Sequence, residues 1–251
     1  MKILITNDDG WGAKGLLTLV DVMRELGDVT VVAPDGPRSG QSNAISVLIP
    51  LRLRKIKEEP RLTVYLSNGT PTDCIKLAIN ELFSDGGPDL IVSGINHGDN
   101  GMVNVIYSGT MGAVFEGCSR GITSIGFSLC DHRPDADFTF FRPHVLELTK
   151  RILAMPRREC LCWNINCPVG PVKGTKITRH CHGYWDKEYV PYTDPNGGTF
   201  FLLTGHFVNT EPDAPDTDQY ANAHGYISVT PTTIDMTDKQ WKDSINTRLE
   251  Y

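Results

Sequence analysis

Short apolar runs alternate with amphipathic segments along the first part of the chain. Residues 3–6 and 29–33 are apolar runs of strand length, and residues 16–26 between them repeat apolar side chains at helical spacing. A strand, a helix and a second strand in this order form a right-handed βαβ unit. The pattern therefore predicts a helix-flanked parallel sheet of the α/β class, with this first unit at its edge.

The same kind of pattern continues through the rest of the chain. It predicts further helices over 70–83, 108–118 and 138–155, and further strands at 90–93, 122–128, 161–166, 175–179 and 226–230. Two extended runs between residues 46 and 66 indicate an antiparallel pair beside the main sheet. Thr237 is positioned to cap a last short helix. Together these elements predict one domain over residues 1–251.

The composition changes between about residues 184 and 224, where Pro, Gly, Asp, Asn and aromatic residues are frequent. We interpret this segment as an extended β-hairpin arm followed by an acidic loop, residues 211–218. The aromatic residues of the stretch 184–209 lack the periodicity of a core-facing segment. We therefore expect the arm to join subunits in a homodimer or a larger assembly.

The charge of the chain indicates which classes of molecule it could bind. With 24 basic and 30 acidic residues the formal net charge is −6, and no stripe of Lys and Arg could follow a nucleic-acid backbone. A nucleic-acid polymer is therefore not an expected partner. A small phosphorylated ligand is compatible, since oriented N–H groups and a bound cation can capture an anion. No apolar stretch is long enough to span a bilayer, so we expect no membrane association.

Seven scattered cysteines and the lack of a secretion signal favour a reducing compartment, and we expect a cytoplasmic protein. Cys160, Cys162, Cys167 and Cys181 raise the alternative of a zinc site. The Cys-x-Cys pair, however, alternates onto one face of a predicted strand, unlike the turn-borne spacing of structural zinc sites. We therefore favour ordinary buried thiols.

Four polar segments are expected to meet at the carboxyl edge of the predicted sheet, where open α/β sheets bind ligands. Each follows a strand or begins a helix: residues 7–10, Ser39 with Gly40, residues 94–96, and Ser108 with Gly109 and Thr110. Adjacent carboxylates such as Asp8 and Asp9 repel each other when both are ionised. Their burial near one another therefore makes sense chiefly around a cation.

Oxygen atoms from these segments suit a hard, magnesium-like cation. Such an ion takes about six oxygen ligands, and four would come from Asp8, Asp9, Ser39 and Asn96, leaving positions for water or phosphate. Unpaired N–H groups and the helix dipole at Ser108 to Thr110 suit an oxyanion. The alternatives are a solvated Asp-Asp-Gly turn and simple helix capping.

Competing chemistries have weaker support in the sequence. The glycine-rich stretch 94–101 lacks the spacing of a dinucleotide fingerprint, and no Walker A sequence is present. His97 and His206 are candidate general acids, although a surface or supporting role is the more common one for a polar histidine.

Five segments then carry a family resemblance: ILITNDDG, APDGPRSGQSNAIS, NGTPTDC, IVSGINHGDN and YSGTMGAVFEG. Together they closely resemble the SurE family of stationary-phase survival proteins with 5'-nucleotidase activity. The resemblance continues more weakly in LCWNINCP, KITR and GYISVTP, so it spans nearly the whole chain.

The resemblance implies a Rossmann-like domain whose extended C-terminal arm exchanges between subunits, giving dimers or tetramers. It implies a phosphomonoesterase that hydrolyses nucleoside 5'-monophosphates with one divalent cation, Mg²⁺ or Mn²⁺, per subunit. Further candidate substrates are 3'-nucleotides and short polyphosphate. The implied metal positions are Asp8, Asp9, Ser39 and Asn96, of which Asp8, Asp9 and Asn96 are also catalytic. The implied phosphate positions are Ser39, Gly40, Ser108, Gly109 and Thr110.

For the reaction, we expect the cation to polarise a phosphoryl oxygen and orient an attacking water, while Ser108, Thr110 and local N–H groups stabilise the phosphoryl oxygens. A covalent role for Asp8 or Asp9 as nucleophile is the alternative. Two rival functions remain open: a non-enzymatic nucleotide-binding module, and a general phosphatase or short-chain polyphosphatase.

Overall fold

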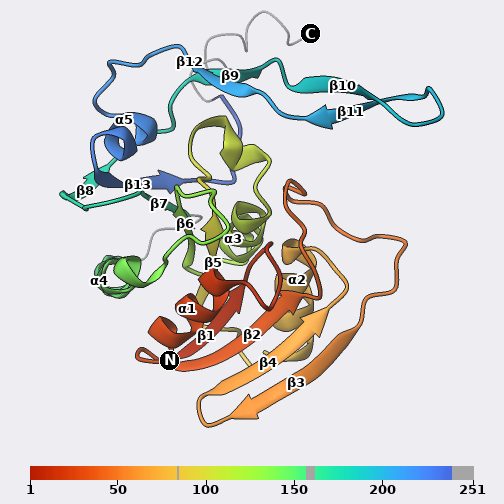
Figure 1. Ribbon diagram of the computed structural model, residues 1–251. Helices are drawn as coiled ribbons and strands as arrows, with labels where there is room; N and C mark the ends of the chain where they lie inside the picture. The colour runs from red at the N-terminus through yellow and green to blue at the C-terminus, as the bar shows by residue number, and fades with distance from the viewer. Residues whose placement is uncertain (84, 157–161, 239–251) are drawn as a thin grey trace, which may run out of the picture.

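Nine strands form one central sheet in the computed structural model, which describes residues 1–83, 85–156 and 162–238 (Figure 1). The strands are β1 (Lys2–Thr6), β2 (Asp28–Pro34), β3 (Leu53–Glu59), β4 (Leu62–Ser67), β5 (Leu90–His97), β6 (Ser124–Leu129), β7 (Cys162–Cys167), β8 (Gly174–Ile177) and β13 (Tyr226–Thr232). Their order is β3-β4-β2-β1-β5-β6-β7-β13-β8. The six strands from β4 to β7 are parallel, so the predicted α/β class is confirmed.

Helices cover both faces of the sheet. They are α1 (Lys14–Met23), α2 (Pro71–Glu81), α3 (Gly109–Ser119), α4 (Arg142–Leu153) and the short α5 (Asp218–Ala223), with 3-10 turns η1 (Met102–Ile106) and η2 (Thr139–Phe141). Side chains alternate along a strand, so Ile3 and Ile5 pack with α1 and α4, while Leu4 packs with α2 and α3. Each such buried aliphatic side chain stabilises the fold by about 1.5–3 kcal/mol.

The first βαβ unit lies inside the sheet, and its predicted edge position is wrong. The sheet continues beyond β2 because β4 adds to β2 in parallel and β3 adds to β4 antiparallel. The antiparallel pair predicted within residues 46–66 is therefore present, but it extends the main sheet instead of standing beside it.

The first strand of that pair is also shorter than its apolar pattern suggests. It begins at Leu53, and Leu48 before it is 93% exposed. The Asn68 side chain replaces a neighbouring strand here, since it accepts a hydrogen bond from Arg52 N–H and donates one to the Pro50 carbonyl. These bonds hold the segment in an irregular loop that leaves its apolar side chains in solvent.

Most other predicted elements are present with shifted ends. α2 begins with a capping box in which Thr70 and Asp73 exchange hydrogen bonds, and this start agrees with the helix predicted over 70–83. The helix predicted from residue 138 starts as the 3-10 turn η2 and becomes α4 at Arg142. Leu161, the predicted start of β7, and the last helix predicted after Thr237 lie outside the described residues.

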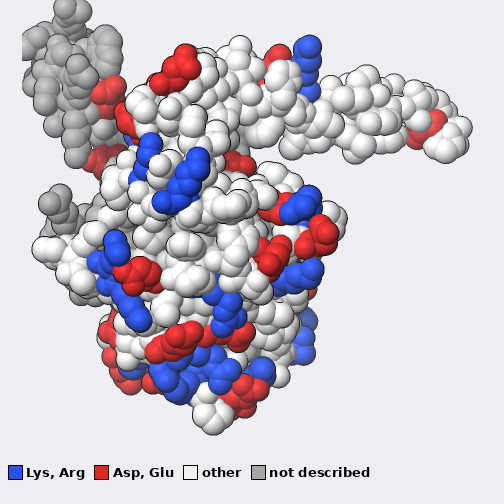
Figure 2. All heavy atoms as spheres, turned by 60° about the vertical axis from the view of Figure 1, so that its left-hand side comes forward, with Lys and Arg blue, Asp and Glu red and all other residues white. Residues whose placement is uncertain are grey.

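A two-part hairpin arm projects from the body of the molecule (Figure 1). It consists of β9 (Gly183–Asp186) paired with β12 (His206–Asn209), and β10 (Tyr189–Thr193) paired with β11 (Thr199–Leu203). The predicted C-terminal hairpin is thus confirmed. Figure 2 shows few charged side chains on the arm, in contrast to the body. No helix in the described part of the chain is long and apolar enough to cross a bilayer.

The topology of the sheet contains a switch point beside β1. From β1 the chain continues through α1 to β2 on one side, whereas β5 lies on the other side of β1. Crevices form at the carboxyl ends of strands where the direction of connection reverses in this way. Gly15 of α1 packs directly on β5, since a Cβ there would lie 2.0 Å from the Ile95 carbonyl oxygen. This close contact holds α1 against the end of β5 at this switch point.

Candidate active site

Two adjacent carboxylates stand at this switch point, directly after β1. The Asp8 side chain is buried and Asp9 is half-buried. The chain then turns away at Gly10, whose φ of 91° is a conformation that side-chain-bearing residues rarely adopt. The turn therefore leaves both carboxylates at the switch point of the sheet.

Asp8 is held by two other elements. Thr110 Oγ1 donates a hydrogen bond of 2.6 Å to Asp8 Oδ1, and Arg38 N–H donates one of 2.7 Å to the Asp8 carbonyl oxygen. Gly109 approaches so closely that a Cβ there would lie 2.9 Å from the Asp8 Cβ. Asp8 therefore joins the end of β1, the loop after β2 and the start of α3.

Asp9 is tied to the end of β5, where His97 N–H donates a hydrogen bond of 3.2 Å to Asp9 Oδ2. Asn96 belongs to β5 itself, although its sequence context predicts a loop. The Asn96 Nδ2 donates to the Gly98 carbonyl at 2.8 Å. This hydrogen bond turns the NH₂ group of the buried amide toward Gly98. The Asn96 Oδ1 atom is therefore the one that could bind a cation.

The two candidate general acids have different surroundings. His97 Nε2 lies 2.6 Å from the Arg133 carbonyl oxygen, and its ring packs edge-on against Phe138. This geometry suits a supporting role beside Asp9. His206 lies on β12 of the arm, 3.9 Å from Asp186.

The loop carrying Ser39 and Gly40 is exposed but tethered at both ends. Its start is bonded to the Asp8 carbonyl. At its far end Ser42 donates two hydrogen bonds, of 3.0 and 2.6 Å, to carbonyl groups just before α3. Gly40 has a φ of 73°, which lets the backbone turn between these tethers. The structure thus brings the four predicted polar segments to one edge of the sheet.

The start of α3 combines helix capping with a hydroxyl that can still donate. Ser108 Oγ accepts a hydrogen bond of 3.0 Å from Met111 N–H, so the capping interaction considered from the sequence is present. The Ser108 hydroxyl proton remains able to donate to a ligand. The Thr110 hydroxyl, by contrast, is buried and donates to Asp8.

The electrostatics of the crevice follow from the burial of like charges. Burial raises the pKa of Asp8 from 3.8 to about 6; hydrogen bonds from Thr110 oppose the rise and the charge of Asp9 adds to it. Burial also raises the pKa of Asp9, opposed by the hydrogen bond from His97 N–H. A cation beside these groups would favour their ionised forms at neutral pH.

The residues around the carboxylates fit a hard divalent cation. Among the described residues, no group of three or more His, Cys, Asp and Glu side chains is placed to hold a metal. A cation bound here would therefore need neutral oxygen ligands, of which Ser39 and Asn96 are the candidates, besides Asp8 and Asp9.

Asn7 adds a feature to which the sequence pattern assigns no role. Its side chain is completely buried, its Nδ2 donates a 2.9 Å hydrogen bond to the Gly10 carbonyl, and its Oδ1 has no hydrogen-bond partner in the described part of the chain. A buried oxygen without a partner calls for an ordered water or ion. The sequence signal that could have indicated this role is the position of Asn7 directly before Asp8 and Asp9.

The cysteines considered for zinc fit the prediction of buried thiols. Cys162, Cys167 and Cys181 are buried, and Cys160 lies outside the described residues. Burial raises the pKa of Cys167 to about 12 and that of Cys181 to about 11. Both thiols are therefore protonated at neutral pH, which disfavours metal binding.

Comparisons with known proteins agree with this arrangement. The family described as Survival protein SurE matches residues 3–187. The 5'-nucleotidase SurE of Phocaeicola vulgatus is 49% identical over 94% of this chain and 91% of that protein. The 5'-nucleotidase SurE of Bacteroides thetaiotaomicron is 47% identical over 97% of this chain and 94% of that protein.

A solved structure shows the same fold. The crystal structure of SurE protein from Aquifex aeolicus matches with a TM-score of 0.84 and 32% sequence identity, covering 98% of this chain and 99% of that one. Together, these similarities confirm the predicted family, the predicted fold and the prediction that the chain is an enzyme.

With divalent cations removed by a chelator, the free energy of unfolding should rise as the pH is lowered from 7.5 to 5. A carboxyl group whose pKa is raised by folding stabilises the folded state at low pH, and this contribution is lost as the pH rises through about 6 for Asp8. The change amounts to at most about 3 kcal/mol. Urea unfolding across this pH range measures it.

Asp8→Asn is the matched variant, because it removes the titrating group and nearly preserves its shape. The variant should lack the part of the pH dependence that comes from Asp8. Equal pH dependence in parent and variant would show that Asp8 does not titrate in this way.

Proposed function

The chain belongs to the SurE family, and from that premise we propose that it hydrolyses nucleoside 5'-monophosphates to nucleosides and phosphate with one divalent cation per subunit. The observation that carries the proposal is the meeting of Asp8 and Asp9 with the start of α3 at the switch point of the sheet. Paired carboxylates suit a cation, and a helix start suits the phosphate beside it.

We assign the cation, Mg²⁺ or Mn²⁺, to Asp8, Asp9, Ser39 and Asn96. When bound, it would polarise the phosphoryl group and favour an attacking water. Thr110 orients the Asp8 carboxylate through its hydroxyl, and His97 N–H orients Asp9. These bonds preorganise the two acids before substrate binds.

The phosphate is assigned to the space bordered by Ser39, Gly40, Ser108, Gly109 and Thr110. There the Ser108 hydroxyl and the first N–H groups of α3 can donate to phosphoryl oxygens. The Thr110 hydroxyl serves Asp8, so the expected contact of Thr110 with phosphate is through its backbone. Asp8, Asp9 and Asn96 are the catalytic residues of this proposal.

Water is our preferred nucleophile. The Asp8 carboxylate accepts from Thr110 and the Asp9 carboxylate from His97, which commits both acids to fixed positions in the proposed cation site. A covalent phosphoryl group on either carboxylate is the alternative.

The substrate range is the open part of the proposal. The alternative of a binding module without turnover is disfavoured, because the relatives are named 5'-nucleotidases. Activity on 3'-nucleotides and short polyphosphate is a further part of the proposal, because the phosphate end of the site is accessible at the exposed loop of Ser39 and Gly40.

We also propose that subunits assemble through the arm. Exposed apolar side chains gather on it, among them Tyr189 at 65%, Phe201 at 62% and Leu203 at 69% exposed. A contiguous apolar surface of this kind is typical of an interface. A cytoplasmic location, favoured by the scattered cysteines, remains part of the proposal.

Phosphate release from a substrate panel tests the proposed activity. The panel contains nucleoside 5'- and 3'-monophosphates, sugar phosphates and short polyphosphate, with Mg²⁺, Mn²⁺ and chelator compared. We expect 5'-monophosphates to be hydrolysed only with metal. Asn96→Ala should lower kcat/KM by about tenfold or more, because it removes a cation ligand. Asp28→Asn, an exposed acid at the start of β2 and so at the strand end opposite to the site, is the control. Metal-dependent binding without release from any substrate would favour the binding module.

Light scattering tests the arm. We expect the parent to form dimers or tetramers at micromolar concentration, and the double variant Phe201→Ser, Leu203→Ser to dissociate, because it removes apolar area from the proposed interface. Leu17→Ser changes a 42% exposed apolar residue on α1 and should leave the assembly intact. A monomeric parent would contradict the proposal.

A further inference from the structure

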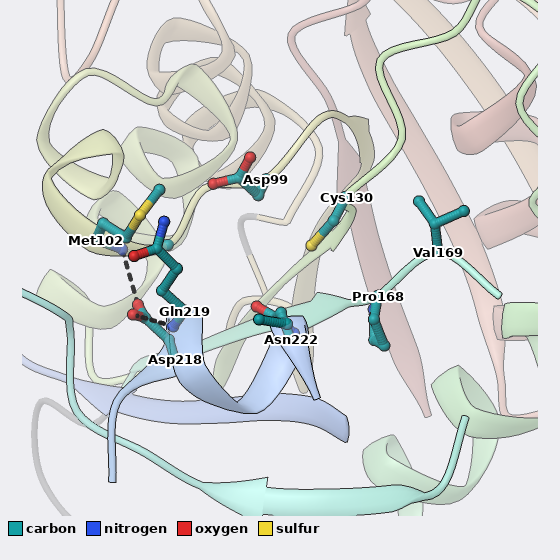
Figure 3. A pocket seen from close by; sticks show the side chains of 10 residues that line it. Asp99, Met102, Cys130, Pro168, Val169, Asp218, Gln219 and Asn222 are labelled. Atoms are coloured by element: carbon teal, nitrogen blue, oxygen red, sulfur yellow. Dashed lines mark hydrogen bonds between the residues drawn. The ribbon is translucent and has the colours of Figure 1, made fainter. Parts of the chain in front are cut away.

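A cavity of about 390 Å³ opens at the carboxyl edge of the sheet (Figure 3). It lies between α5 and the residues that directly follow β5, β6 and β7, and its lining includes Asp99, Met102, Cys130, Val169, Asp218 and Ala223. Its volume is within the range of small-molecule sites, roughly 300–1,000 Å³. Asp8 and Asp9 do not line it, so it is a neighbouring compartment of the same sheet edge.

The cavity is within reach of a substrate held at the carboxylates. Asp99 follows Asn96 by three residues, so their Cα atoms cannot be more than about 11 Å apart. A nucleotide whose phosphate lies near Asn96 extends over a comparable length. The nucleoside part of such a molecule can therefore enter the cavity while its phosphate stays at the start of α3.

One wall of the cavity is fixed by a buried polar network beneath Asp99. Asn100 N–H donates to Asn166 Oδ1 at 2.7 Å, and Asn100 Nδ2 donates to Ser128 Oγ at 2.9 Å. The Asn100 carbonyl oxygen accepts from Asn164 Nδ2 at 2.7 Å. Buried networks in which every group is paired rigidify their surroundings, so Asp99 stands on a preorganised loop.

Asp218 fixes the opposite wall, where α5 begins. Its buried carboxylate accepts hydrogen bonds from the N–H groups of Met102, Cys181 and Gln219 and contacts His180 Nδ1 at 2.9 Å. These four partners occupy the carboxylate. Asp218 is therefore a positioning residue that ties the loop after β5 to α5 and to the base of the arm.

Asp99 is the acidic group left to meet a ligand. Its side chain is 24% exposed; Asn104 Nδ2 donates a hydrogen bond of 3.3 Å to Asp99 Oδ2, and His132 Nε2 lies 3.5 Å from Asp99 Oδ1. A carboxylate has about four acceptor positions, so Asp99 can accept further hydrogen bonds. Figure 3 shows Asp99 at the cavity, with Met102 on one side, Cys130 on the other and α5 opposite.

The lining favours a neutral ligand that combines a flat apolar surface with hydrogen-bond donors. Two carboxylates in the walls disfavour a second anion, while Met102, Pro168 and Val169 offer apolar contact that a hydrated ion would not use. A nucleoside has these properties. Its donors are ribose hydroxyls and base N–H groups.

We infer that this cavity is the subsite for the nucleoside part of the substrate and that Asp99 accepts a hydrogen bond from the ribose or the base. Asp99 is then a specificity-determining residue. The assignment of a substrate rests on the proposed function, but nucleoside binding by the cavity can be measured without hydrolysis.

Calorimetric titration of the four ribonucleosides into the full chain, in chelator, tests the subsite directly. We expect the parent to bind at least one of them. Ala223→Trp should weaken that binding at least tenfold by filling the cavity from an exposed position on α5, and Asp99→Asn should weaken it similarly. Asp213→Asn, an exposed acid of the loop before α5, is the matched control and should bind as the parent does. Melting temperatures establish that each variant is folded.

The same proteins are then assayed with metal on nucleoside 5'-monophosphates and on glycerol 3-phosphate, which has no nucleoside. We expect the ratio of the two kcat/KM values to fall at least tenfold in Ala223→Trp and Asp99→Asn. Binding of ribonucleosides, 2'-deoxyribonucleosides and free bases is compared to identify which group donates the hydrogen bond to Asp99. Each of these measurements uses the folded full chain.

The outcomes separate this inference from the proposed function. No binding of any nucleoside by the parent at millimolar concentration, or parent-like affinity and substrate ratio in both variants, would overturn the subsite. Nucleoside binding that both variants weaken, in a parent that hydrolyses no phosphate ester, would support the subsite and refute the proposed hydrolysis.

Discussion

Two neighbouring carboxylates, one buried and one half-buried, are the constraint on which the rest of this site depends. Burial disfavours the ionised form of Asp8 and Asp9, which is why the pKa of each is raised. Hydrogen bonds from Thr110 and His97 offset part of that cost. A divalent cation would offset much more, because its charge opposes both carboxylates at once. The arrangement is thus suited to holding a metal and costly without one.

The close packing around the site follows from the same constraint. α3 can donate to Asp8 only by approaching it, and the approach leaves no room for a side chain at Gly109. Gly15 similarly allows α1 to lie against the end of β5. These contacts set the carboxylates between three elements whose positions the hydrophobic core fixes. The chemistry therefore depends on backbone packing as much as on the polar side chains.

Local patterns predicted those features that local residues determine. The apolar period predicted β1, α1 and β2, and the rule of strand ends predicted that the acids after β1 lie beside the end of β5 and the start of α3. The pattern predicts an extended run through Leu48, but Asn68, distant in sequence, bonds the backbone there and holds it as a loop. The sequence predicts Asp218 in an acidic loop, because no neighbouring residue indicates its bond to Met102, more than a hundred residues earlier. The cavity could not be predicted either, because residues far apart in the sequence form its walls.

The shift in melting temperature caused by Mg²⁺ or Mn²⁺ tests most directly whether Asp8 and Asp9 share a cation. Metal that binds the folded state should raise the melting temperature of the parent, and Asp8→Asn should lose most of that rise while remaining folded in chelator. Asp28→Asn, an exposed acid outside the site, should keep it. A folded Asp8→Asn protein with the same metal-induced shift as the parent would contradict the role given to Asp8.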